Sequence, residues 1–108
     1  MERNSQKFKQ LVYDLMNGSL NLRDYPVEES RYVENEYGEG KFCEETYSKI
    51  FDLNRKLCER LGIGDGEDED VEDMINYLFD IQRHMCMKMY EYGWLFAKIE
   101  EDKKNASK

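Results

Sequence analysis

The chain has 108 residues, of which 37% are charged and one is proline, and its formal net charge is −8. This length fits one domain with a modest core, and an acidic chain without a basic stripe is not expected to bind nucleic acid directly. The N-terminus lacks the apolar segment of a secretory signal, and no apolar run is long enough to cross a bilayer. We therefore expect a single domain over 1–108 that is cytoplasmic and does not bind a membrane.

The N-terminal third predicts two short helices. The first runs over about 5–16, where apolar residues recur at helical spacing, Asn4 or Ser5 can cap the start, and an Asn-Gly pair marks the end. The second is predicted over about 26–37, because Pro26 suits the first turn of a helix and a Gly-Glu-Gly sequence follows.

The rest of the chain predicts a pair of longer helices, over about 41–61 and 70–101. A Gly-Ile-Gly sequence ends the first of them, and an acidic loop leads into the second. Because this connection is short, we expect the two helices to pack as an antiparallel hairpin. Residues 104–108 are predicted to be a frayed tail. The expected fold is therefore all-α, with a hairpin and two shorter N-terminal helices.

One apolar stripe organises the last helix and is predicted to face the core. It comprises Val71, Met74, Ile75, Leu78, Ile81, Met85, Met89, Tyr92, Phe96 and Ile99. With its flanks the apolar arc covers roughly 220° of the helix, so one partner helix cannot cover it. We expect the segment 32–37 to cover the C-terminal end of the stripe. We also expect a neighbour to approach closely at Gly93, because glycine is costly inside a helix.

The polar back of the same helix is interrupted by two large apolar residues, Met87 and Trp94. Exposed apolar patches mark contact surfaces, and Trp is enriched among residues that dominate interfaces. We therefore predict a non-enzymatic protein that acts through protein–protein contacts, with a protein partner or as a homodimer. The candidate interface residues are Met87, Trp94, Phe79, Cys86 and Tyr90. The alternative is that the N-terminal helix folds over Trp94 within one chain.

Acidic residues form two patches along the chain. The first comprises Glu28, Glu29, Glu34 and Glu36, and the second comprises Asp65, Glu67, Asp68, Glu69, Asp70, Glu72 and Asp73. The second fails the calcium-loop pattern and is typical of an acidic helix cap. An alternative function is an acidic nucleic-acid mimic, of the kind phages and mobile elements encode, which would occupy a nucleic-acid-binding protein.

The sequence indicates no catalytic, cofactor-binding or metal-binding site. His84 and Cys86 lie two apart on a helix and point in nearly opposite directions, so they cannot share an ion. The three cysteines are expected to be reduced thiols. Asn54 and Gln82 are polar residues within the apolar stripes of the two long helices, and we expect them to be hydrogen-bonded and to fix the register of the helices.

Two segments, Leu11–Leu22 (LVYDLMNGSLNL) and Met89–Ala97 (MYEYGWLFA), resemble those of small uncharacterised proteins of low-GC Gram-positive bacteria and their mobile elements. In that group a short first helix ends in Asn-Gly, and the last helix ends with an aromatic residue, a glycine and an apolar run. The group usually has proline soon after Asn-Gly, whereas here it comes only at Pro26. The resemblance implies an all-helical fold and no catalytic residues.

Overall fold

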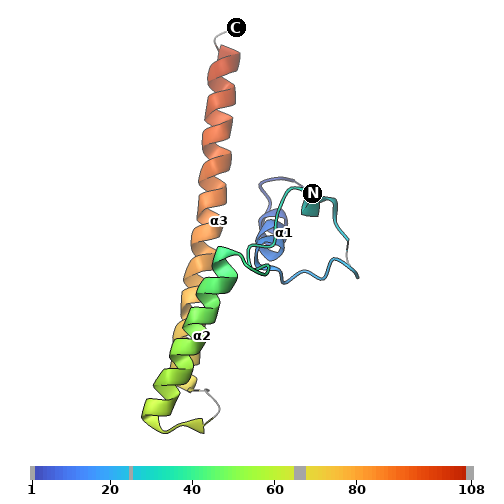
Figure 1. Ribbon diagram of the computed structural model, residues 1–108. Helices are drawn as coiled ribbons and strands as arrows, with labels where there is room; N and C mark the ends of the chain where they lie inside the picture. Colours follow the sequence, from blue (N-terminus) through green and yellow to red (C-terminus); the bar gives the residue numbers. More distant parts are fainter. Residues whose placement is uncertain (1, 25, 65–67, 107–108) are drawn as a thin grey trace.

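The computed structural model describes residues 2–24, 26–64 and 68–106. Within these ranges the chain is all-helical and contains no strand (Figure 1). The helices are α1 (Gln6–Asn17), the short 3-10 helix η1 (Glu28–Arg31), α2 (Phe42–Leu61) and α3 (Glu69–Ala106). The prediction of an all-α fold with a long C-terminal helix is therefore confirmed.

Local signals set the ends of α1 and α2. The side chain of Ser5 caps α1 by accepting a hydrogen bond from the Phe8 N–H at 3.1 Å. Gly18 and Gly62 end the two helices in the left-handed conformation, with φ of 76° and 72°. Glycine adopts that conformation without a steric penalty, and its N–H returns to the last turn of the helix. Both helices begin and end within about one residue of the predicted positions.

The helix predicted over 26–37 is wrong, because only the single turn of η1 forms there. The Asn35 side chain accepts a hydrogen bond from the Tyr37 N–H at 2.9 Å, and the Glu36 N–H donates to the Met16 carbonyl at 2.6 Å. Asn side chains compete with a helix by bonding to nearby backbone in this way. The segment is therefore held as a loop against the end of α1.

The long helix α3 has 38 residues and extends further than the predicted 70–101. It is about 57 Å long at 1.5 Å per residue, and the molecule measures 69 × 30 × 23 Å. The frayed tail predicted over 104–108 is wrong for 104–106, which are helical, and 107–108 lie outside the described residues. The close approach predicted at Gly93 is also wrong, since a Cβ there would meet nothing within 4 Å.

In Figure 1, α2 runs beside the N-terminal half of α3 and in the opposite direction. The rings of Tyr47 and Phe79 join the two helices, with 6.0 Å between centroids. Further along, an open groove of about 210 Å³ separates them, lined by Ile50, Leu53, Asn54, Leu57, Val71, Met74 and Ile75. The close packing predicted for the hairpin is therefore not established within one chain.

Few side chains of the described residues are buried. They are Phe8, Lys9, Leu15, Cys58 and Met87. The radius of gyration is 18.9 Å, whereas a compact domain of this length has about 13 Å. The segment 32–37 does not cover the C-terminal end of α3, where Tyr92, Phe96 and Ile99 are exposed. The chain alone thus encloses a much smaller core than its apolar content could form.

Candidate protein–protein interface

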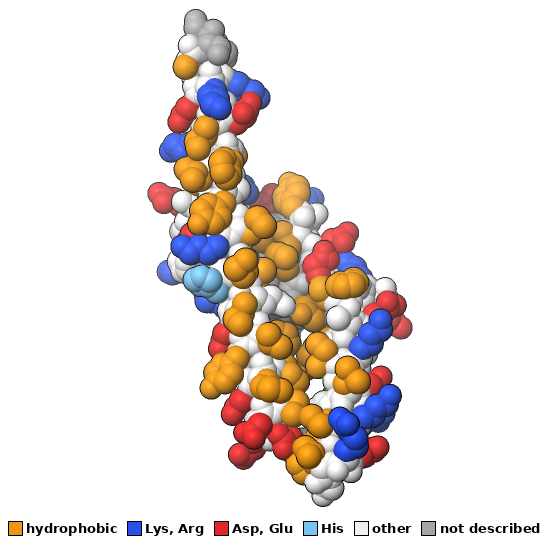
Figure 2. Space-filling model, turned by 90° about the vertical axis from the view of Figure 1, so that its left-hand side faces the viewer, with side chains coloured by type: hydrophobic (Ala, Val, Ile, Leu, Met, Phe, Trp, Pro, Cys, Tyr) orange, Lys and Arg blue, Asp and Glu red, His pale blue; other side chains and the backbone are white. Residues whose placement is uncertain are grey.

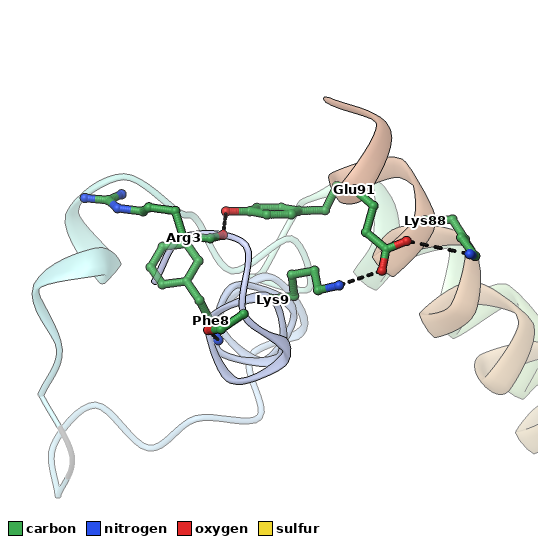
Figure 3. A network of polar contacts seen from close by, with 7 residues as sticks. Arg3, Phe8, Lys9, Lys88 and Glu91 are labelled. Carbon is green, nitrogen blue, oxygen red and sulfur yellow. Dashed lines mark hydrogen bonds and ion pairs between the residues drawn. The ribbon is translucent and has the colours of Figure 1, made fainter. Parts of the chain in front are cut away.

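An ion pair fixes α1 against the middle of α3. Lys9 Nζ lies 2.6 Å from one carboxylate oxygen of Glu91, and Lys88 Nζ lies 3.6 Å from the other (Figure 3). The hydrogen bond from Lys9 holds the pKa of Glu91 below its usual range, although partial burial acts in the opposite direction. The Lys9 side chain is 7% exposed, and a buried ammonium without a partner is costly. The pair therefore specifies where α1 docks.

Apolar contacts surround this ion pair on the same side of α3. The Phe8 and Tyr90 rings pack with 6.3 Å between centroids, and the Tyr90 hydroxyl donates to the Arg3 carbonyl oxygen at 2.6 Å. Met87, one turn before Glu91, is buried. The side of α3 that carries Met87 and Tyr90 is therefore the one covered by α1.

A second contact region lies where α1, α2, α3 and the loop before α2 meet. It is a half-open pocket of about 340 Å³ lined by Tyr13, Asn17, Ser19, Tyr37, Tyr47, Phe79 and Gln82. Gln82 donates to the Tyr13 hydroxyl at 3.1 Å and also bonds to Tyr37, whose pKa is raised mainly by burial. The lining carries no acidic or basic side chain, and its central polar group, Gln82, is already paired. We conclude that this region joins the helices and assign it no ligand.

The structure places the predicted interface residues mostly on the covered side of α3. Met87 is 8% exposed beneath α1, and Tyr90 is half-buried against Phe8. Phe79 packs against α2, Cys86 is half-buried, and Trp94 is 40% exposed. The alternative of the sequence analysis placed the N-terminal helix over Trp94 within one chain; here α1 docks beside Met87, and Trp94 stays partly exposed. Met87 and Tyr90 thus serve the contact with α1.

The opposite side of α3 is open to solvent. Its exposed side chains are Met74, Tyr77, Leu78, Ile81, Met85, Met89, Tyr92, Leu95, Phe96 and Ile99, which we call the exposed stripe. Met89 is 72% exposed. The prediction that the apolar stripe of this helix faces the core is wrong in the single chain for eight of its ten residues, whereas Val71 and Ile75 are half-buried. The reason is geometric: Met85 and Met87 are two residues apart, about 200° around the helix, and α1 docks on the side of Met87.

Exposed apolar side chains continue from α3 onto α2. Those of α2 are Phe42, Tyr47, Ile50, Phe51, Leu53 and Leu61. Figure 2 shows hydrophobic side chains running along both helices on one face of the molecule, with α1 behind them. The sequence carried a signal for this surface, because an apolar arc of roughly 220° exceeds what the few helices of one small chain can cover. Most of these exposed apolar residues of α3 are therefore ones that the sequence analysis assigned to the core.

The two acidic patches lie at different ends of the molecule. Asp68 caps α3, its carboxylate accepting a hydrogen bond from the Val71 N–H at 3.1 Å, whereas Asp65 and Glu67 lie outside the described residues. The first patch begins in η1, and its Glu34 pairs with Lys41 at 3.0 Å. In Figure 1, η1 and the start of α3 are far apart. The patches therefore do not form one continuous acidic surface.

Asn54 and Gln82, the predicted polar residues of the long helices, are both half-buried. Asn54 accepts a weak hydrogen bond from the buried Cys58 thiol at 3.6 Å, and Gln82 bonds to Tyr13. Among the described side chains, every fully enclosed nitrogen or oxygen has a hydrogen-bond partner. Both residues are thus hydrogen-bonded, and their role in fixing the register of the helices stays a prediction.

Comparisons with protein-family models, curated proteins and solved structures find no match to this chain. The resemblance to small Gram-positive proteins therefore stays a prediction. Over the described ranges, none of the helices combines the length and apolar content of a membrane span. The same ranges bring together no three His, Cys, Asp or Glu side chains that could hold a metal ion.

Proposed function

We propose that this protein acts without catalysis, through protein–protein contact, and that it self-associates through the exposed stripe of α3 and the adjoining apolar face of α2. The observation that carries the proposal is the exposure of this stripe along nearly the whole of α3. Contiguous apolar surface of this extent usually marks an interaction site. The predicted hairpin belongs to the same proposal: a second copy supplies the side chains that fill the groove between α2 and α3.

The surface area supports a second copy as the occupant. The chain exposes 9062 Å², whereas a compact monomer of 13.0 kDa exposes about 6,300 Å². The excess is roughly 2,700 Å², and obligate dimer interfaces bury about 1,000–2,500 Å² on each partner. The exposed surface is therefore large enough for an obligate dimer, and a small core that cannot support the fold alone gains most from such an interface.

Sedimentation equilibrium of the full chain tests the proposal. We expect a dimer at micromolar concentrations, and we expect Met89→Lys to shift it toward the monomer because it places a charge within the stripe. The matched control is Asn76→Lys, which makes the same charge on an exposed position of α3 outside the stripe and should leave the dimer intact. A wild-type chain that remains monomeric at high concentration overturns self-association.

Salt separates this proposal from the acidic-mimic alternative. An apolar interface loses little affinity as ionic strength rises, whereas binding of a mimic to a basic groove weakens steeply. We expect the sedimentation profile to be nearly unchanged between low and high salt. No observation in the structure favours the mimic over self-association.

A further inference from the structure

The two halves of α3 differ in what lies beside them. The helix α2 has 20 residues, about 30 Å, and lies beside the N-terminal half of α3 only (Figure 1). The C-terminal half carries Tyr92, Leu95, Phe96 and Ile99 on the exposed stripe, with no α2 residue beside them. One half of the hairpin thus offers an apolar groove, and the other half offers a bare apolar helix.

We propose that two copies bind antiparallel, so that the C-terminal half of each α3 lies along the α2–α3 groove of the other copy. This inference rests on the proposed self-association and names its geometry. A two-fold axis near the middle of the stripe, between Met85 and Met89, places Met85 of each copy beside Met89 of the other copy. The same operation places Phe96 near Leu78. Both grooves are then filled and the assembly closes on itself, as two-fold interfaces do.

Charge along α3 favours the antiparallel arrangement. The N-terminal segment 69–80 carries five acidic residues and no basic one. The segment 94–105, which the two-fold operation places opposite it, carries three basic and three acidic residues. Parallel pairing would set the two strongly acidic segments side by side, and like charges repel. Antiparallel pairing instead sets each acidic segment against a segment with no net charge, and it also places the two helix dipoles in opposite directions.

The position of α1 is compatible with this arrangement. Its contacts with Met87, Tyr90 and Glu91 lie on the side opposite the stripe, and its Tyr13 reaches Gln82 at the flank of the stripe without covering it. A second α3 on the stripe therefore does not displace α1. In a parallel pair, by contrast, the two bare C-terminal halves would contact each other and both α2–α3 grooves would remain open.

A photo-crosslinker placed at position 96 reports directly whether α3 of the two copies runs parallel or antiparallel. We expect Phe96→p-benzoylphenylalanine to yield a covalent dimer whose crosslinks, mapped by mass spectrometry, lie in 71–81 of α3 or in α2 of the second copy. The control carries the crosslinker at Lys98, an exposed position 200° from residue 96, and should give little covalent dimer. Crosslinks from position 96 to 92–103 of the second copy, or a dimer without crosslinks from that position, would overturn the antiparallel arrangement while self-association stands. A monomer overturns both.

A charge variant gives a second test, because it should change the dissociation constant in opposite directions for the antiparallel and the parallel dimer. Glu69→Gln combined with Asp70→Asn removes two acidic charges from the N-terminal end of α3. In the antiparallel dimer these charges lie near Lys103 and Lys104, so the dissociation constant should rise by at least about twofold at low salt. In a parallel dimer the same change removes repulsion and tightens association. A tighter dimer would therefore contradict the proposal.

Discussion

Both sides of α3 carry large apolar side chains, but their surroundings are opposite. On one side Met87 lies beneath α1 and is 8% exposed, and on the other Leu78 is 63% exposed. The covered side adds directional contacts to its apolar ones, since Lys9 pairs with Glu91 and Tyr90 bonds to backbone. The comparison shows that specific polar contacts, together with a docking helix, decided which side one chain buries. The stripe stays exposed, and it is the surface that we propose for a second chain.

The largest effect on folding stability is expected for a substitution on the covered side of α3. Met87→Ala should cost about 2–5 kcal/mol of folding stability, because it leaves a cavity beneath α1. This cost should be the same at all protein concentrations, since the contact lies within one chain. Urea denaturation at two concentrations measures it. A cost below about 1 kcal/mol would mean that α1 does not depend on this contact.

Leu78→Ala probes the other side. The sequence alone places Leu78 in the core, whereas its exposure in one chain predicts a cost of less than about 0.5 kcal/mol where only the monomer is populated. Where the dimer is populated we expect the cost to rise, because burial of a Leu side chain is worth about 1.5–3 kcal/mol. Denaturation across a hundredfold range of concentration reveals the difference. A cost independent of concentration contradicts burial of Leu78 between chains.

Gly18→Ala tests the junction between α1 and the loop that follows it. The positive φ of Gly18 disfavours alanine by about 1–2 kcal/mol, and a Cβ would lie 2.6 Å from the Asn35 side chain. Thermal unfolding should show a lower midpoint. Gly62→Ala is a matched control, because it has the same left-handed conformation with nothing within 4 Å of the Cβ. It should cost less.

Gly93→Ala is expected to stabilise the chain. A Cβ at this position meets nothing within 4 Å, and alanine is more favourable than glycine in a helix by up to about 1 kcal/mol. The thermal midpoint of the variant should rise. A lower midpoint would show that another chain approaches α3 at this residue.

Glu91→Gln should have the smallest effect, because Gln keeps a side-chain oxygen that can accept the hydrogen bond from Lys9, and the effect should depend on pH. Because the hydrogen bond from Lys9 lowers the pKa of Glu91 in the folded state, its contribution is present above the unfolded value of about 4.3. It is lost as pH falls through the lower folded-state pKa. Thermal midpoints of the wild type and the variant should therefore differ at pH 7 and converge in acid. A difference that persists at low pH would assign the effect to packing.

The sequence by itself determined the helices that are set by local interactions. Ser5, Gly18 and Gly62 act on backbone within a few residues, so the ends of α1 and α2 were predicted closely. Local signals predicted a helix over 26–37 that does not form, because the Asn35 side chain and the contact between Glu36 and α1 favour a loop there. The helix-forming signals of that segment were too weak to compete with contacts the sequence does not reveal.

Only the tertiary structure decided which side of α3 is covered. The hydrophobic effect is non-directional, so an apolar stripe indicates that burial is favourable without naming the partner. The position of α1, specified by Lys9 and Glu91, connects residues more than eighty positions apart. This long-range pair holds α1 on the side of Met87, which is buried, and leaves Met89, two residues later on the opposite side, exposed to solvent.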